Sequence, residues 1–267
     1  MKKVILLSSA LALILFFSTC KEDEPAKTGN LTLHFIELVD YVPLVTDSMK
    51  YTNEAGNEYL ITEVQYFISN VKISMQDGED FNITQDGGIH YIDRDIPDTK
   101  TWEIEGEFPT GTIDSISFTF GLDEATNQSG LFVNPPESMM YWPEVLGGGY
   151  HYMKMNGKWL DVNNQIQMFN FHLGIGQTYD SLAIVTGFVQ NYFRVNCTVP
   201  VFSSYLPVIR TDSMNHVAVI MNIDSWFKTP HTWDFNLMGG MMMQNEEAMK
   251  MACENGTDVF TIGPYVE

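Results

Sequence analysis

Histidines and methionines are the side chains whose types and spacing in this sequence suggest chemistry. His151 and His172 lie in two apolar segments joined by a turn-rich loop at residues 157–164. If these segments pair as a hairpin, both imidazoles can reach one point, and imidazole nitrogens suit copper or zinc. Met153, two residues beyond His151, would share its strand face, and His34 lies in a third strand of similar character. The alternative for each histidine is a structural role within a strand.

Methionine is the second unusual feature, with 16 residues in the chain and a cluster at residues 238–243. Thioethers are soft ligands that select Cu(I). They also fill irregular gaps in apolar cores. Histidines and methionines together therefore indicate a site for a soft or borderline metal, with core packing as the alternative.

The elements that must position these residues are short strands separated by turn residues. Alternation at period two over residues 31–38, 66–73 and 115–120 is typical of half-buried strands. Further strand-like runs cover residues 150–155, 166–173, 181–189, 193–201 and 216–223. The spacing, without intervening helices, predicts an all-β fold, a single antiparallel β-sandwich. One short C-terminal helix is expected over residues 245–253, with Asn245 as its N-cap.

The N-terminus has the features of a bacterial lipoprotein signal. Lys2 and Lys3 precede an apolar stretch of about fourteen residues, shorter than the roughly 20 that span a bilayer. Small residues then run into Cys20, as in a lipobox. We expect a signal peptide at 1–19, a lipidated tether at 20–29 and one domain at 30–267; the alternative is a transmembrane anchor with an incidental cysteine. The acidic residues after Cys20 resemble the surface-export signal of Bacteroidetes lipoproteins.

Charge and cysteine content narrow the possible partners. The formal net charge is −20, which repels nucleic acid and anionic lipid and attracts cations, metal ions included. We therefore expect no nucleic-acid binding and anchoring to the cell outer membrane through lipid on Cys20, with a surface-exposed domain or one facing the periplasm. Cys197 and Cys253 remain, and in an oxidising compartment a disulfide between them is expected, two buried thiols or a soft-metal pair being the alternatives.

The sequence shows no motif of a known catalytic class. GxSxG, HExxH and phosphate-binding GxxxxGK[ST] patterns are absent, and no cysteine is placed as a nucleophile. Acidic residues are plentiful, so paired carboxylates of a glycosidase stay open, but no pair stands out. We expect a binding protein, not an enzyme.

Several segments resemble one family in their order and spacing. They are residues 31–34, 58–71, 120–127, 140–142, 149–154 and 171–174, within about residues 30–262. Together they resemble the MbnP-like family, named for the copper-binding partner protein of methanobactin operons, in a lipoprotein member of Bacteroidetes type. The resemblance implies an exported β-rich protein that binds copper. In some relatives a tryptophan, oxidised to kynurenine by a di-haem partner enzyme, joins two histidines at the metal.

The resemblance matches His172 to a family ligand and Trp142 to the oxidised tryptophan, with His151 extending the Gly-Tyr segment. Relatives often carry a second tryptophan where this chain has Glu144, and Trp142 has a core aromatic as its alternative role. The resulting hypothesis is copper capture or storage outside the cytoplasm by His172 and His151, with His34 and Met153 as further candidate ligands. The alternative is a metal-free module for glycan or protein ligands.

That alternative would use exposed tryptophans in a flat row. The candidates for it are Trp102, Trp159, Trp226 and Trp233.

Overall fold

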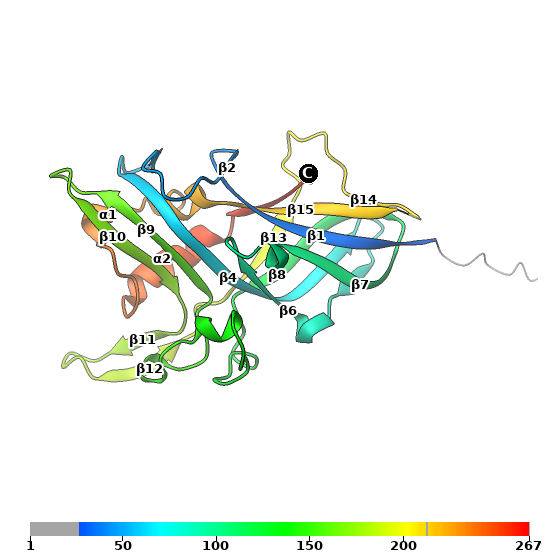
Figure 1. Ribbon diagram of the computed structural model, residues 1–267. Coiled ribbons are helices and arrows are strands. Elements are labelled where there is room, and N and C mark those ends of the chain that lie inside the picture. The colour runs from blue at the N-terminus through cyan, green and yellow to red at the C-terminus, as the bar shows by residue number, and fades with distance from the viewer. Residues whose placement is uncertain (1–26, 212, 267) are drawn as a thin grey trace, which may run out of the picture.

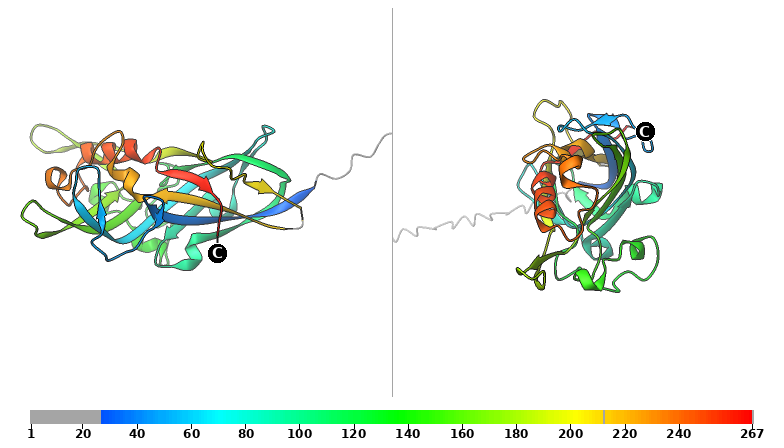
Figure 2. Two further views of the ribbon diagram at one scale, coloured as in Figure 1. Left: turned by 90° about the horizontal axis from the view of Figure 1, so that it is seen from above. Right: turned by 90° about the vertical axis from the view of Figure 1, so that its left-hand side faces the viewer.

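The computed structural model describes residues 27–211 and 213–266 and shows two β-sheets packed face to face (Figures 1 and 2). The smaller sheet has five strands in the order β16-β15-β1-β2, with β7 also paired to β1. Its strands are β1 (Thr28–Val39), β2 (Val42–Pro43), β7 (Thr101–Pro109), β15 (Met214–Asn222) and β16 (Phe260–Gly263).

The larger sheet has nine strands, with β10-β9-β4-β8-β13 as its main path. Short strands β3, β5 and β6 pair with β4, and β14 pairs with β8. Its strands are β3 (Tyr51–Thr52), β4 (Glu58–Met75), β5 (Asp80–Asn82), β6 (Ile89–Asp93), β8 (Gly111–Phe120), β9 (Met153–Leu160), β10 (Ile166–Leu173), β13 (Phe193–Thr198) and β14 (Val208–Ile209). A separate hairpin joins β11 (Gly176–Tyr179) and β12 (Val185–Val189) and projects beside β9 and β10 (Figure 1).

Helices are few and short. Helix α2 (Glu246–Gly256) begins at Asn245, whose side chain accepts a hydrogen bond from the Ala248 amide, and α1 (Phe235–Met238) is a single turn. The 3-10 helices are η1 (Gln85–Gly88), η2 (Pro97–Lys100), η3 (Glu137–Met140), η4 (Glu144–Leu146) and η5 (Ile223–Phe227). The prediction of an all-β sandwich with one short C-terminal helix and an Asn245 cap is confirmed.

The core lies between the sheets, where alternate residues of the long strands meet. Ile116, Phe118 and Phe120 of β8 are fully buried, as is Tyr66 of β4. Phe120 packs against several aromatic rings, Trp226 among them at 5.2 Å between ring centres. Such pairs add about 0.5–1.5 kcal/mol beyond the burial of their area. The aromatic core therefore fixes how β4, β8 and their neighbour β9 lie.

One pair of strands departs from the antiparallel pattern. β1 and β15 run parallel, with Asn30 to Leu38 opposite Met214 to Asn222. Parallel neighbours need a long crossover connection, and here most of the chain lies between the two strands. The other strand pairs within the described residues are antiparallel.

The expected disulfide is wrong for this structure, since Cys197 and Cys253 are both free thiols. Cys197 points into the core from β13, opposite Ile116 of β8. Cys253 lies on α2, and its thiol donates a hydrogen bond to the Asn191 carbonyl. Burial raises the pKa of the Cys253 thiol to about 12 and that of Cys197 higher still. Burial therefore keeps both thiols protonated, in line with the alternative of two buried thiols left open above.

The predicted signal peptide and Cys20 lie outside the described residues. No helix within residues 27–211 and 213–266 is long and apolar enough to cross a membrane.

The tryptophans of the metal-free alternative are not exposed. Trp102, Trp159, Trp226 and Trp233 are each at most 6% exposed and belong to the core. The expectation that they form a flat surface row is wrong, because each indole packs among other aromatic rings between or beside the sheets.

Candidate metal centre

The hairpin of β9 and β10 brings the two histidines together. In its register His172 lies opposite Lys154, and Leu173 lies opposite Met153. Because side chains alternate along strands, His172 and Lys154 occupy the outer face of this hairpin, whereas Met153 and Leu173 point into the core. His151 lies two residues before the start of β9, and its ring centre lies 5.1 Å from that of His172.

A glycine-rich turn sets the position of His151. Gly147, Gly148 and Gly149 all have positive φ, at 119°, 71° and 78°, a region that other residues adopt only with strain. Asn127 and Ser129 hold the end of this turn, since their side chains accept hydrogen bonds from the Tyr150 and Gly149 amides at 2.8 Å. The chain therefore enters β9 along one fixed path.

His151 is oriented by a backbone carbonyl. Its Nδ1 lies 2.9 Å from the Met140 oxygen, and since a carbonyl only accepts, Nδ1 carries the hydrogen. The neutral ring therefore has its lone pair on Nε2. Burial lowers the pKa of His151 to about 4, with the nearby Lys154 charge acting in the same direction. His151 is thus neutral at physiological pH and has one nitrogen free to act as a ligand.

His172 is oriented by a chain of two side chains. Its Nε2 lies 2.7 Å from Asn156 Oδ1. The Asn156 amide donates from Nδ2 to the Glu63 carboxylate, which only accepts, so Oδ1 must face His172. Nε2 therefore carries the hydrogen and Nδ1 the lone pair. His172 Nδ1 is buried and has no hydrogen-bond partner.

The electrostatics of the pair oppose protonation. Burial lowers the pKa of His172 to about 3, and His151 and Lys154 contribute in the same direction. Lys154 itself donates from Nζ to the Met139 carbonyl at 2.6 Å, and burial lowers its pKa as well. Both imidazoles are thus held as neutral nitrogen donors, the form that binds a metal.

Trp142 lies against this pair. Its ring centre is 4.6 Å from that of His151, at an interplanar angle of 77°, and the side chain is fully buried. Its Nε1 donates to the Leu146 carbonyl at 3.1 Å. A Cβ on Gly174 would come within 2.6 Å of the indole, so only glycine lets the chain pass Trp142 directly after β10. The Met-Tyr-Trp and Phe-His-Leu-Gly segments are therefore in direct contact.

A family model for MbnP matches residues 28–246 of this chain, which contain all the side chains of the centre described in this subsection. The chain belongs to the MbnP family.

Among solved structures, MbnP from Methylosinus trichosporium is similar to this family member with a TM-score of 0.55 and 12% sequence identity. The match covers 90% of this chain and 100% of that one, and at such low identity it shows the shared fold. A comparison with curated proteins finds no match.

Two candidate ligands do not join the centre of this MbnP family protein. Met153 is fully buried in the core. The prediction that it shares the face of His151 is wrong, because the backbone bends at Tyr152 before the regular alternation of β9 begins. His34 belongs to β1 of the other sheet, where its Nε2 lies 2.9 Å from His216 Nδ1.

Sequence reasoning missed Asn156 and Glu63, which fix the tautomer of His172. Asn156 lies opposite Asn170 on β10 and Glu63 on β4, so it bridges three strands. Its place in Asn156-Gly157 resembled a turn signal, and only the register of β4 could have shown its contact with a carboxylate.

Across residues 27–211 and 213–266 of this MbnP family protein, no three or more His, Cys, Asp and Glu side chains are grouped to hold a metal ion. A metal held by His151 and His172 would therefore need another kind of ligand. The free lone pairs of Nε2 and Nδ1 fit a nitrogen-binding metal, and the neighbouring ring is Trp142.

Proposed function

We propose that this MbnP family protein binds a copper ion through His151 Nε2 and His172 Nδ1 and holds it outside the cytoplasm without turnover. The observation that carries the proposal is the buried His172 Nδ1, a lone pair with no hydrogen-bond partner beside a second neutral imidazole. A buried polar atom without a partner costs about 1–3 kcal/mol in free energy. A metal bound through this nitrogen would remove that cost.

Copper fits the donor set better than the hard cations do. Imidazole nitrogen suits copper, zinc and nickel, whereas magnesium and calcium prefer oxygen ligands. For a given set of nitrogen ligands, Cu²⁺ binds more tightly than the other divalent metals of the first row. Because the pKa values of His151 and His172 lie near 4 and 3, protons do not compete with the metal at neutral pH.

The position of Trp142 supports a site in which a modified tryptophan joins the two histidines, as in some relatives. The ring lies against His151, and no carboxylate or thiolate completes the ligand set in the described part of the chain. Oxidation of Trp142 to kynurenine, by a di-haem partner enzyme as in some relatives, would add a polar ligand at this place. We propose Trp142 as the site of that modification.

Export and anchoring complete the proposal. The lipobox-like residues before Cys20 support a lipid anchor in the outer membrane, with the acidic tether favouring the cell surface over the periplasmic face. The net charge of −20 raises the local concentration of cations at the protein. Together these features support capture or storage of copper before it enters the cell.

The test compares copper binding by the wild-type protein and a His151→Ala/His172→Ala variant in competition with a chelator of known affinity. His231→Ala is the matched control, since His231 lies elsewhere, paired with Glu254 of α2. We expect the control to bind like the wild type and the double variant to lose the tight copper. Circular dichroism checks that each variant folds. Equal copper binding by wild type and double variant would refute the proposal, and a wild type that binds no copper would favour a metal-free binding module.

Mass spectrometry of protein from its native cells tests the Trp142 proposal separately. We expect the peptide that contains Trp142 to carry the mass of kynurenine. An unmodified tryptophan in copper-loaded native protein would contradict that part of the proposal.

A further inference from the structure

A second pair of histidines lies on the outer face of the five-stranded sheet. His34 of β1 and His216 of β15 approach until Nε2 and Nδ1 are 2.9 Å apart, with the ring centres 5.1 Å apart. His34 is only 7% exposed, whereas His216 is exposed to solvent. This pair is separate from His151 and His172, which belong to the other sheet.

The parallel pairing of β1 and β15 creates this contact. Thr32 lies opposite His216 and His34 opposite Ala218, so the two histidines are diagonal neighbours. Leu33 and Val217, the residues between these positions, are buried in the core. By alternation, both imidazoles therefore point outward from the same face of the sheet.

Neighbouring side chains fix the ring of His34. Tyr265 stacks on it with 3.5 Å between ring centres and an interplanar angle of 7°. On the other side, Thr101 Oγ1 of β7 lies 3.4 Å from His34 Nδ1. The buried imidazole is thus pre-oriented, and the exposed imidazole of His216 is open to an ion arriving from water.

We propose that His34 Nε2 and His216 Nδ1 form a second metal site that takes a divalent borderline cation, Cu(II) above all. Two nitrogens 2.9 Å apart, each about 2.0–2.1 Å from a metal, subtend an angle of about 90° at that metal. This angle is far from the linear arrangement of two-coordinate Cu(I). The geometry therefore favours a centre with four or more ligands, the rest being water.

Binding requires only a shift of proton within one ring. In the metal-free pair, one of the two facing nitrogens donates its hydrogen to the other. If His34 is the donor, its proton moves to Nδ1 of the same ring. There the N–H can donate a hydrogen bond to the Thr101 hydroxyl oxygen. If His216 is the donor, the proton moves to Nε2 of the same ring. Both facing nitrogens then present lone pairs, and the net charge of the pair is unchanged.

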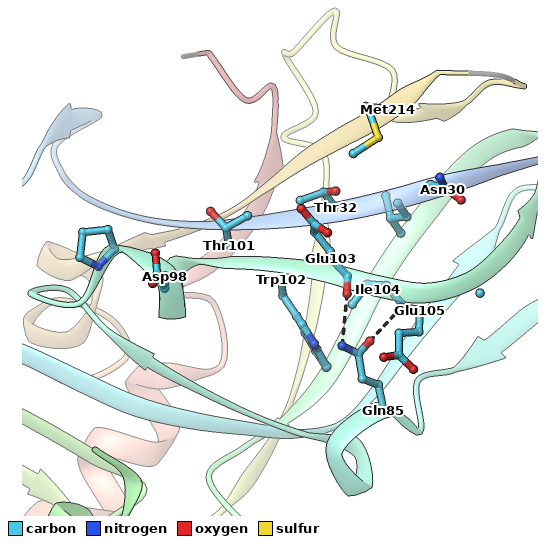
Figure 3. Close-up of a pocket in the computed structure, with 13 residues that line it drawn as sticks. Asn30, Thr32, Gln85, Asp98, Thr101, Trp102, Glu103, Ile104, Glu105 and Met214 are labelled. Carbon is cyan, nitrogen blue, oxygen red and sulfur yellow. Dashed lines mark hydrogen bonds between the residues drawn. The ribbon is translucent and has the colours of Figure 1, made fainter. Parts of the chain in front are cut away.

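An acidic groove of about 920 Å³ adjoins this site along β1 and β7 (Figure 3). It is lined by three carboxylates, Asp98, Glu103 and Glu105, and by no basic side chain. Thr101, which contacts His34, lines the same groove. Carboxylates that line a groove attract cations and raise their local concentration there. The groove would therefore supply ions to the histidine pair.

The test is Cu(II) stoichiometry, measured by calorimetry and electron paramagnetic resonance on the full chain with four sets of substitutions. The background variant is His151→Ala/His172→Ala, which removes the centre proposed above. We expect it to keep one Cu(II) with a tetragonal spectrum and splitting from two imidazole nitrogens. Adding His216→Ala should abolish that signal, whereas adding His231→Ala should leave it intact. His216 is exposed, so its substitution leaves the fold in place.

The outcomes separate this site from the proposed function. His216→Ala alone should lower the stoichiometry of the wild type by one Cu(II) and leave the tight copper at His151 and His172. Failure of the background variant to bind Cu(II), or unchanged binding after His216→Ala is added to it, overturns the second site. Neither result bears on the first centre, because those histidines are already absent from the background variant.

Discussion

Asn156 should control the copper affinity of His172 although it would not touch the metal. Its Oδ1 accepts the hydrogen of His172 Nε2 at 2.7 Å, which leaves the lone pair on Nδ1. Asn156→Ala removes that acceptor, so the Nδ1–H tautomer, which cannot bind through Nδ1, becomes populated. Loss of such a partner behind a metal-ligating histidine typically lowers metal affinity 10–100-fold, or about 1.4–2.7 kcal/mol.

Glu63→Gln is the informative comparison. A glutamine oxygen still accepts from Asn156 Nδ2, so the amide keeps its orientation and Oδ1 still faces His172. We expect the copper affinity of this variant to stay within about threefold of wild type, well below the loss expected for a missing partner. Asn163→Ala, in the exposed turn of the same hairpin, serves as the neutral control.

The assay is competition for copper against a chelator at pH 7, combined with nitrogen NMR of the His172 ring in the metal-free protein. Stability should fall by about 1–3 kcal/mol in Asn156→Ala through the lost hydrogen bonds, which urea unfolding measures separately. Unchanged copper affinity in Asn156→Ala, or a wild-type ring protonated on Nδ1, would refute the tautomer argument.

Three further expectations concern packing, pH and thiols. Gly174→Ala places a Cβ 2.6 Å from the Trp142 ring and should destabilise the protein by about 1–3 kcal/mol in urea unfolding, so unchanged stability would contradict the contact. Burial lowers the pKa of His90 to about 4, below its value of about 6.5 in the unfolded chain. Protons therefore bind the unfolded chain first, and the free energy of unfolding decreases as the pH falls from 6.5 towards 4. Between pH 7 and 5 this loss should reach about 2 kcal/mol; His90→Gln should flatten the profile by that amount, and an equally steep profile would refute the assignment. Because Cys197 and Cys253 are free, a reductant should leave the melting temperature unchanged, whereas a drop would show a disulfide.

The local parts of the fold could be predicted from sequence, because strand alternation and turn residues are short-range signals. The strand expected at residues 166–173 is β10 as it stands in the structure, and the Asn245 cap starts α2. The expected strand at 66–73 covers only the second half of β4, which runs from Glu58 to Met75. Polar residues such as Glu63 and Gln65 interrupt the apolar pattern there and form hydrogen bonds with other side chains.

Long-range pairing set the limit of prediction for the site. The proximity of His151 and His172 could be predicted because a single short loop joins their strands. The neighbour of His34 could not be found in this way, because β15 starts near residue 214 and pairs in parallel with β1. Met153 was misplaced for a local reason, the bend at Tyr152, which interrupts the alternation on which the prediction depended.

Anomalous diffraction at the copper edge, from crystals of the copper-loaded protein, tests the central claim most directly. We expect a copper peak bonded to His151 Nε2 and His172 Nδ1, with His172 Nε2 still hydrogen-bonded to Asn156. A lack of copper at His151 and His172, or copper bound through His172 Nε2, would contradict the account.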